Sequence, residues 1–261
     1  MSNFRCERGI ILLELLFVIM IMGLLIAGAV KTWDVTIQQT RFNQTVKELD
    51  ELSMAIVGNP NLYTEGKRTD FGYVGDMGSL PDSLADLVRA PSGAISWRGP
   101  YVKVKFNEDF EDYLKDAWGD YYIYSRESLY IRSYGGGTIL TPNTWITKRF
   151  ARDSISLIRN IVQGRVTDLL NNPPGAGIDT LFLTVGIIYP VNNGTSMATQ
   201  IRHPNAQGNY ILTDIPQGNH LMFCLYDTTP SLPDTTDYVE KYGCIYPGVI
   251  NEVNFRLTVG F

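Results

Sequence analysis

A long apolar run near the start of the chain restricts its fold more than any other feature. Residues 10–30 contain a single charge, Glu14, and no proline. About 20 apolar residues are enough for a helix to cross a bilayer. Arg5 and Arg8 precede the run, and basic residues beside a membrane helix are retained on the cytoplasmic side. The sequence therefore predicts a membrane-spanning helix over residues 10–30, with the rest of the chain on the opposite side.

The helical pattern continues beyond the apolar run. Apolar residues recur at gaps of three and four, at Phe42, Val46, Leu49, Leu52 and Ile56. This spacing places them on one face of a helix, where they can pack against a core. The first strong helix-breaking sequence is Gly58-Asn59-Pro60. We expect one continuous helix over about residues 10–57, on the order of 70 Å long at 1.5 Å per residue.

Glu14 is the one charged residue within the apolar run. On insertion scales an acid at the centre of a membrane helix costs about 2.5–3.5 kcal/mol, so acids in such segments usually have a partner or a role. Glu14 lies near the helix start, where this cost is smaller. It is either an interfacial acid stabilised by the helix dipole or a residue with a role in assembly.

The segment Arg8-Gly9-Ile10-Ile11-Leu12-Leu13-Glu14 resembles the leader junction of type IV prepilins and type II secretion pseudopilins. In that family a prepilin peptidase cuts after the glycine, the new amine is methylated, and a glutamate is fifth in the mature chain. The resemblance implies that residues 1–9 are removed, that Ile10 is methylated, and that Glu14 acts in assembly. Ile10 departs from the usual phenylalanine, at a position that mainly requires an apolar residue.

An ordinary secretory signal peptide is the main alternative at this end of the chain. Ala27-Gly28-Ala29 is similar to a signal-peptidase site, and the basic residues before the run would form the n-region. Glu14 inside the run argues against this alternative, as does the helical pattern that continues to Ile56. A lipoprotein signal fits less well, because Cys6 precedes the apolar run.

Residues 31–150 have the pattern of a small domain built around the end of the long helix. Residues 59–75 predict a loop, and residues 81–88, with Pro81 in the first turn, predict a short helix. Strand patterns cover residues 101–106, 121–124 and 129–134, and the last two predict a hairpin. We expect the long helix to pack on a small antiparallel sheet.

Three segments of this region resemble the major pseudopilin of type II secretion: Leu80-Pro81-Asp82-Ser83-Leu84, Trp97-Arg98-Gly99-Pro100-Tyr101 and Lys115-Asp116-Ala117-Trp118-Gly119-Asp120-Tyr121-Tyr122-Ile123-Tyr124. With the leader motif, the resemblance covers about residues 9–135. The family binds calcium in the loop that follows, and calcium requires several oxygen ligands. Here residues 135–145 contain no acid. The sequence therefore favours a tight glycine turn over a calcium site, and it predicts no other metal or cofactor.

Residues 160–261 show short apolar alternations separated by turn clusters. Strands are predicted over residues 162–166, 181–187, 210–212, 221–226 and 253–259. Several strands at this spacing indicate a β-sandwich. Segments such as Gly208-Asn209-Tyr210-Ile211-Leu212 and Ile215-Pro216-Gln217-Gly218-Asn219-His220 resemble the carboxypeptidase regulatory-like, transthyretin-like sandwich, a domain that serves as a spacer or binding module.

The polar residues of this extension give little support for catalysis. Gly194-Thr195-Ser196-Met197-Ala198 is similar to the nucleophile segment of subtilisin-like proteases, but Gln200 replaces the expected proline and the other segments of that family are missing. A serine nucleophile requires a histidine base and an acid that orients it. We expect His203 and His220 at the surface or in turns, and we do not expect an enzyme.

Charge and cysteine content narrow the remaining functions. The net charge of -5 and the lack of a Lys/Arg cluster argue against nucleic-acid binding. Removal of the leader would eliminate Cys6 and leave Cys224 and Cys244. In an oxidising compartment these two could form a disulfide, worth roughly 3 kcal/mol in the loop-entropy model. Two buried free thiols are the alternative.

Together these features predict an α+β protein with four segments. They are a leader over residues 1–9, a transmembrane half-helix over 10–30, a pilin-like periplasmic domain over 31–150 and a β-sandwich over 160–261. The expected function is that of a pseudopilin or minor pilin of a type II secretion pseudopilus or type IV pilus-like filament. We expect a single-pass inner-membrane protein whose C-terminal part is periplasmic or extracellular.

The expected partners are the prepilin peptidase and copies of the chain or other pilins, with no small-molecule substrate. The alternative is a membrane-anchored periplasmic binding or adhesion protein that does not polymerise.

Overall fold

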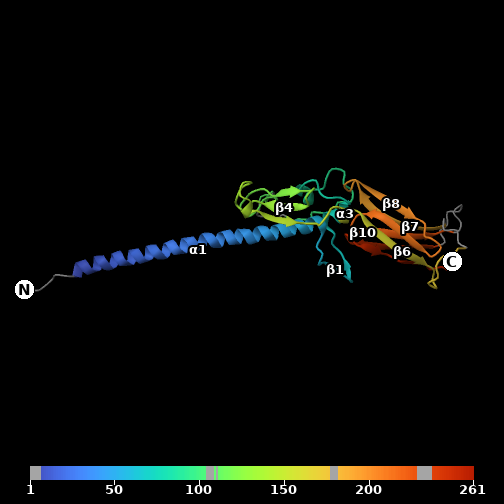
Figure 1. Ribbon diagram of the computed structural model, residues 1–261, viewed down its shortest axis with the longest axis horizontal. Coiled ribbons are helices and arrows are strands. Elements are labelled where there is room, and N and C mark those ends of the chain that lie inside the picture. The colour runs from blue at the N-terminus through green and yellow to red at the C-terminus, as the bar shows by residue number, and fades with distance from the viewer. Residues whose placement is uncertain (1–6, 104–108, 110, 177–181, 228–236) are drawn as a thin grey trace, which may run out of the picture.

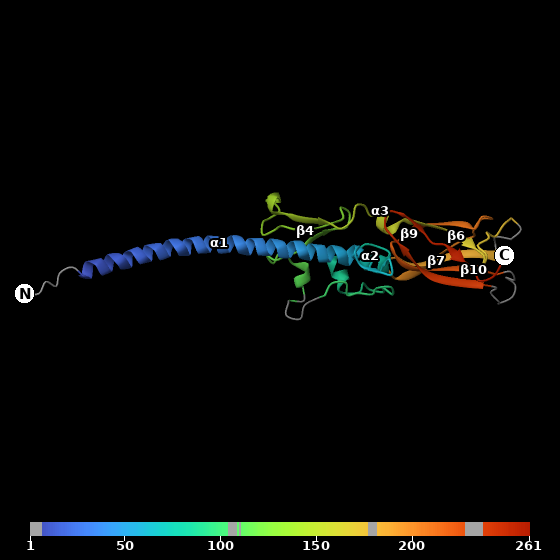
Figure 2. The same ribbon diagram turned by 90° about the horizontal axis from the view of Figure 1, so that it is seen from below.

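The computed structural model describes residues 7–103, 109, 111–176, 182–227 and 237–261, with side chains from Leu13 onward. One helix, α1 (Glu7–Val57), carries the folded parts of the chain at its C-terminal end (Figure 1). The helix is 51 residues long and unbroken, which confirms the continuous helix expected over residues 10–57. Its first half projects away from the rest of the molecule as a separate rod in both views (Figure 2).

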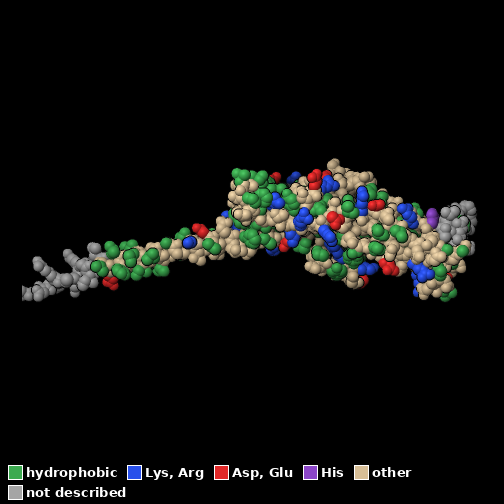
Figure 3. Space-filling model, in the orientation of Figure 1, with side chains coloured by type: hydrophobic (Ala, Val, Ile, Leu, Met, Phe, Trp, Pro, Cys, Tyr) green, Lys and Arg blue, Asp and Glu red, His purple; other side chains and the backbone are tan. Residues whose placement is uncertain are grey.

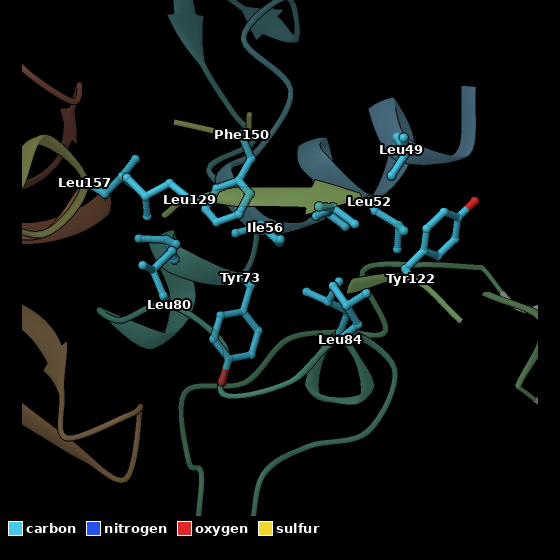
Figure 4. Packing of buried hydrophobic residues seen from close by; sticks show 14 of the residues in the cluster. Leu49, Leu52, Ile56, Tyr73, Leu80, Leu84, Tyr122, Leu129, Phe150 and Leu157 are labelled. Atoms are coloured by element: carbon cyan, nitrogen blue, oxygen red, sulfur yellow. The ribbon is translucent and has the colours of Figure 1, made fainter. Parts of the chain in front are cut away.

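The second half of α1 packs against the first of two hydrophobic cores (Figure 4). Three residues of the expected apolar face are at most 2% exposed there: Leu49, Leu52 and Ile56. The face differs from the expectation at its start, because Phe42 is 45% exposed whereas Thr45 is fully buried. The reason is that the folded part begins beside Thr45, whose hydroxyl accepts a hydrogen bond from the Ala117 N–H at 3.2 Å.

Short elements surround this half of the helix, and residues 45–158 are called the head below. After α1 come β1 (Tyr63–Thr64), β2 (Lys67–Arg68), α2 (Gly72–Met77) and the 3-10 helices η1 (Leu84–Leu87) and η2 (Asp112–Leu114). They are followed by β3 (Ile123–Ser125), β4 (Tyr130–Ser133), η3 (Pro142–Thr144), β5 (Ile146–Arg149) and α3 (Ile155–Ile158). The last three strands form an antiparallel sheet in the order β3-β4-β5.

The hairpin predicted over residues 121–134 is confirmed, since β3 and β4 pair antiparallel. The third strand, β5, was not predicted, and it completes the sheet that covers α1. Lys148 on β5 forms an ion pair with Asp50 of the helix at 2.6 Å. The expected arrangement of a long helix on a small antiparallel sheet is therefore present, with one strand more than the sequence indicates.

Other local predictions for the head were less accurate. The helix predicted over residues 81–88 is present only as the shorter η1. A capping box of Ser83 and Asp86 lies at the start of η1. Residues 59–75 contain β1, β2 and the start of α2 instead of a loop alone. The strand predicted over residues 101–106 does not form over 101–103, and its remainder lies outside the described residues.

The C-terminal part, called the sandwich below (residues 160–261), contains two sheets that face each other in Figure 2. The first has the order β11-β10-β7-β8 and is antiparallel throughout: β7 (Leu183–Val191), β8 (Ser196–Arg202), β10 (Gly218–Tyr226) and β11 (Asp237–Ile245). In the second, β6 (Asn160–Thr167) pairs antiparallel with β9 (Asn209–Ile215) and parallel with β12 (Ile250–Glu252) and β13 (Phe255–Arg256).

The two sheets enclose a second hydrophobic core. Alternate residues of each strand point into it, among them Val162, Leu212, Val185, Ile187 and Met222, all fully buried. This arrangement is that of a β-sandwich, as expected. The strands predicted from apolar alternation are present. Leu181, at the start of one of them, lies outside the described residues, and the last strand is shorter than predicted. β8 and β11 were not predicted, because their outward residues interrupt the usual alternation of apolar and polar side chains.

Candidate functional site

The first half of α1 presents apolar side chains on every side. All described side chains from Leu13 to Gln44 are exposed, and the most apolar window of the helix has a mean hydropathy of 2.6. Figure 3 shows hydrophobic side chains along this projecting rod. A helix that is apolar all round is suited to lipid or to contact with other helices. Among the described residues, α1 is thus the one helix long and apolar enough to cross a membrane.

The residues that the sequence marks for processing lie in the first turns of this helix. Because α1 begins at Glu7, both Gly9 and Ile10 are helical. The side chain of Ile10 and the whole of Cys6 lie outside the described part. Glu14 is four residues after Ile10 and therefore on the same helical face. Its side chain is exposed, and it has no ion pair or hydrogen bond among the described residues. Its carboxyl group is thus open to a partner on another molecule.

An exposed stem, residues 31–44, joins the apolar half of α1 to the head. Thr32, Thr36 and Thr40 each donate their hydroxyl to the carbonyl four residues earlier, at 2.9 Å. This bonding satisfies the hydroxyls within the helix. Trp33 is 70% exposed at the start of the stem, and tryptophan is enriched where membrane helices leave the bilayer. The stem therefore fits a membrane boundary close to the end of the apolar run.

The C-terminal end of α1 is closed by two side chains that are distant in sequence. The carbonyl oxygen of Val57 accepts hydrogen bonds from Arg68 Nη2 at 2.7 Å and from Gln217 Nε2 at 3.0 Å. Gly58 follows in the left-handed conformation that commonly ends a helix, with a φ of 84°. Burial lowers the pKa of Arg68 from its ordinary value, and its positive charge complements the negative end of the helix dipole.

Backbone contacts of the head add to this connection with the sandwich. The carbonyl of Gly194, in the turn before β8, accepts hydrogen bonds from the N–H groups of Ile95 and Ser96 at 2.8 and 3.2 Å. At Gly78, a Cβ atom would lie only 2.2 Å from the carbonyl oxygen of Pro190, so the two backbones approach as closely as glycine permits. The sandwich is therefore held against α2 and the end of α1 by buried polar and backbone contacts.

Residues 135–145, where the sequence favours a tight glycine turn over a calcium site, are held by their own side chains. Gly135 and Gly136 have φ values of 64° and 75°, in agreement with the predicted tight turn. Thr144 Oγ1 donates to the Tyr134 carbonyl at 2.7 Å, and Trp145 Nε1 donates to the Thr138 carbonyl at 3.0 Å. The carbonyl oxygens of Tyr134 and Thr138 are thus already hydrogen-bonded. In the described ranges, no group of three or more His, Cys, Asp or Glu residues could hold a metal.

The predicted disulfide between Cys224 and Cys244 is wrong, because both thiols are free. In the ladder between β10 and β11, Cys224 pairs with Val239 whereas Cys244 pairs with Asn219. The cysteines are thus five positions apart along the strands, about 17 Å at the rise of a strand, and a disulfide requires Cα atoms within about 7 Å. The odd number of positions also places Cys224 in the core and Cys244 on the outer face.

The protease-like segment forms a turn and the start of a strand. Asn192, Asn193 and Gly194 have positive φ values between β7 and β8, and Ser196 is the first residue of β8. Neither histidine is placed to act as a base for Ser196, since each ring bonds to a backbone carbonyl: His203 to Leu183 and His220 to Pro216.

The surface or turn position expected for His220 is wrong, because this residue lies within β10. Its side chain is 3% exposed, because β10 directs it inward between the Tyr189 ring and Gly218.

No protein-family model matches this chain, and no curated protein matches its sequence.

Proposed function

We propose that this chain is a filament subunit, a pseudopilin or minor pilin of a type II secretion pseudopilus or type IV pilus-like machine in the inner membrane. One observation carries this conclusion: α1 is uninterrupted from the Gly9-Ile10 junction, through an exposed apolar half, to a buried half in the head. Such a helix joins a lipid-soluble segment to a folded head without a hinge. Packing of the apolar halves would then fix the positions of the heads.

Glu14 supplies the polar element of this packing. After cleavage behind Gly9 by a prepilin peptidase, the chain would begin with a charged amine at Ile10, in an apolar environment where an unpaired charge is costly. In staggered subunits the amine of one copy can meet the Glu14 carboxylate of another. The pairing neutralises both charges and fixes the axial register, as buried polar residues do in coiled coils.

The sandwich lies at the end of the molecule farthest from the N-terminus (Figure 1). In a filament whose core is made of α1 helices, the head and sandwich would form the outer layer. We assign them a structural or binding role and no catalytic one. The alternative, a membrane-anchored binding or adhesion protein that does not polymerise, is favoured by the exposed apolar residues on the outer faces of both sheets of the sandwich, such as Tyr242 and Ile211. The two functions differ in whether the N-terminus is processed.

Mass spectrometry of the chain purified from membranes tests the proposed function. A filament subunit is expected to begin at Ile10 and to carry one added methyl group. An N-terminus near Lys31 would indicate a secretory signal peptide and would overturn the proposal. An intact leader would instead support the membrane-anchored protein that does not assemble.

A further inference from the structure

The loop between β4 and β5, residues 135–145, carries two exposed apolar side chains, called the tip below. Leu140 is 85% exposed, more than any other large apolar side chain in the described part of the chain, and the adjacent Ile139 is 66% exposed. The loop contains no charged residue. Single apolar residues are ordinary on a protein surface, so the role of this pair depends on how it is held and on where it lies.

The loop holds the tip in a fixed position. The Thr138 N–H donates to Thr141 Oγ1 at 2.7 Å, and the Leu140 N–H donates to Thr138 Oγ1 at 3.2 Å. Below them, Trp145 Nε1 donates to the Thr138 carbonyl at 3.0 Å. Because the loop is already ordered by its own hydrogen bonds, contact of the tip with another surface costs little further conformational entropy.

The loop lies beside the exposed stem of α1. A Cβ atom on Gly136 would be 2.5 Å from Trp118 Nε1, and this nitrogen donates to Gln38 Oε1 on the stem at 2.9 Å. In both ribbon views the loop, yellow-green near residue 140, is at the end of the head nearest the first half of α1 (Figures 1 and 2). Hydrophobic side chains gather at this end of the head (Figure 3). The tip is therefore on the side of the head that a membrane around α1 would face.

The distance from the loop to such a membrane is short. Gln38 is eight residues after Val30, the end of the apolar run, which is about 12 Å along a helix. The headgroup layer outside the hydrocarbon takes up about 5–8 Å of this distance. A segment packed on a helix lies roughly 10 Å from its axis, so the average helix tilt of about 20° lowers it by about 3–4 Å. A tilt toward the loop therefore brings the side chains of the tip to the headgroups.

The residues next to the loop are also of the kind found at membrane interfaces. The Arg132 guanidinium lies 4.4 Å from the centre of the Trp145 ring and 4.4 Å from that of Tyr130. Tryptophan and tyrosine are enriched where a protein meets the headgroups, and arginine can pack its stem on apolar surface while its charge reaches toward phosphate. An apolar tip with aromatic rings and a cation behind it thus fits a lipid surface.

We propose that Ile139 and Leu140 insert among the headgroups of the bilayer that α1 crosses. The proposal rests on the membrane anchoring of α1 but not on leader cleavage or filament assembly. The bilayer is the chosen occupant because α1 itself fixes its position, close to the loop and on the side of the tip. Since α1 continues without a break into the head, this second contact would set the tilt of the helix and the inclination of the head above the membrane.

Fluorescence quenching in vesicles of phosphatidylcholine and phosphatidylglycerol tests this contact in the full-length chain. A dansyl-bearing amino acid replaces Leu140 in one variant and Leu170 in the control. Leu170 is 74% exposed in the turn after β6, at the end of the sandwich far from α1 (Figure 1). Lipids with a nitroxide on the headgroup should quench the probe at 140 several-fold more strongly than the probe at 170. Equal quenching at the two positions, or none at 140, would overturn the proposal.

Dilution with lipid separates the bilayer from a second copy of the chain as the surface that the tip contacts. Quenching at position 140 should stay the same when the protein-to-lipid ratio is lowered, and also in Glu14→Gln. Loss of the quenching in either case would assign the contact to a neighbouring subunit and would overturn the proposal. An uncleaved chain whose probe is still quenched would refute only the proposed function.

Removal of the apolar side chains tests whether the tip itself makes the contact. With the probe at the exposed Asn143 of the same loop, the double change Ile139→Ser and Leu140→Ser should lower headgroup quenching several-fold. Leu170→Ser is the matched control and should not change it. Both sites are exposed, so neither change removes a core contact. Unchanged quenching in the double variant would show that the tip does not hold the loop at the bilayer, and would overturn the proposal.

Discussion

The side-chain amide of Gln217 donates a hydrogen bond of 3.0 Å to the carbonyl oxygen of Val57, the last residue of α1. The two residues are 160 positions apart, and Gln217 is fully buried. The same nitrogen also donates to the carbonyl of Phe71 at 3.1 Å. The end of the long helix is thus bonded directly to the sandwich, so the orientation of the sandwich follows that of the helix.

Gln217→Ala should lower the free energy of unfolding by about 1–3 kcal/mol, because it removes two buried hydrogen bonds that each contribute about 1 kcal/mol. Gln207→Ala, at an exposed position, is the matched control and should change stability little. Urea denaturation of the detergent-solubilised chain, followed by tryptophan fluorescence, measures both. Equal stabilities of the two variants would show that the bond from Arg68 to the Val57 carbonyl suffices without Gln217.

His220 should make the protein less stable in mild acid. Burial lowers its pKa to about 4, whereas a histidine in the unfolded chain has a pKa of about 6.5. Between these values the unfolded chain binds a proton that the folded chain does not. The free energy of unfolding should therefore fall as the pH drops from about 6.5 to 4, by about 3 kcal/mol in all from this residue.

Urea denaturation at a series of pH values measures this contribution of His220. His220→Gln should flatten the dependence between pH 4 and 6.5, whereas the exposed-position control His203→Gln should retain it. A steep dependence that persists in His220→Gln would assign the effect to other groups.

Glu14→Gln should reduce filament assembly or secretion sharply while membrane insertion and cleavage after Gly9 continue, because the substitution removes a charge from the apolar segment. Asp34→Asn, on the exposed stem of the same helix, is the control and should assemble normally. Sheared-filament yield and N-terminal mass report the two properties separately. Wild-type assembly of Glu14→Gln would leave Glu14 as an interfacial acid favoured by the helix dipole.

Removal of calcium should leave the loop at residues 135–145 intact, because its carbonyl groups are bonded to threonine and tryptophan side chains. Thermal unfolding in excess calcium and in chelator should therefore give the same midpoint. Thr144→Ala should lower the free energy of unfolding by about 1 kcal/mol through loss of the bond to Tyr134. A midpoint that rises with calcium would indicate a cation site that the hydroxyl bonds do not exclude.

The two cysteines should differ in reactivity under native conditions. Burial raises the pKa of Cys224 to about 12 and also raises that of Cys244, but only Cys244 is partly exposed. Alkylation without reductant should label Cys244 slowly in the folded chain and Cys224 only after unfolding. An intact mass that stays two hydrogens below the reduced value and resists alkylation would reveal a disulfide and contradict the strand register.

Sequence periodicity predicted the elements whose formation depends on neighbouring residues. The apolar run and the gaps of three and four up to Ile56 determined α1 almost to its ends, since helical hydrogen bonds join residues four apart. The β3–β4 hairpin and most sandwich strands followed from local alternation and turn residues. The candidate site in the first half of α1 could be located for the same reason, because Gly9, Ile10 and Glu14 are adjacent in the chain.

Only the tertiary structure decided which polar groups are buried and which strands are neighbours. His220 and Gln217 appear in the sequence as part of a turn, yet both are buried because the sandwich packs against α2 and the end of α1. The register of β10 and β11 separates Cys224 from Cys244. These contacts join residues far apart in the chain, and their energies depend on packing that no local pattern encodes.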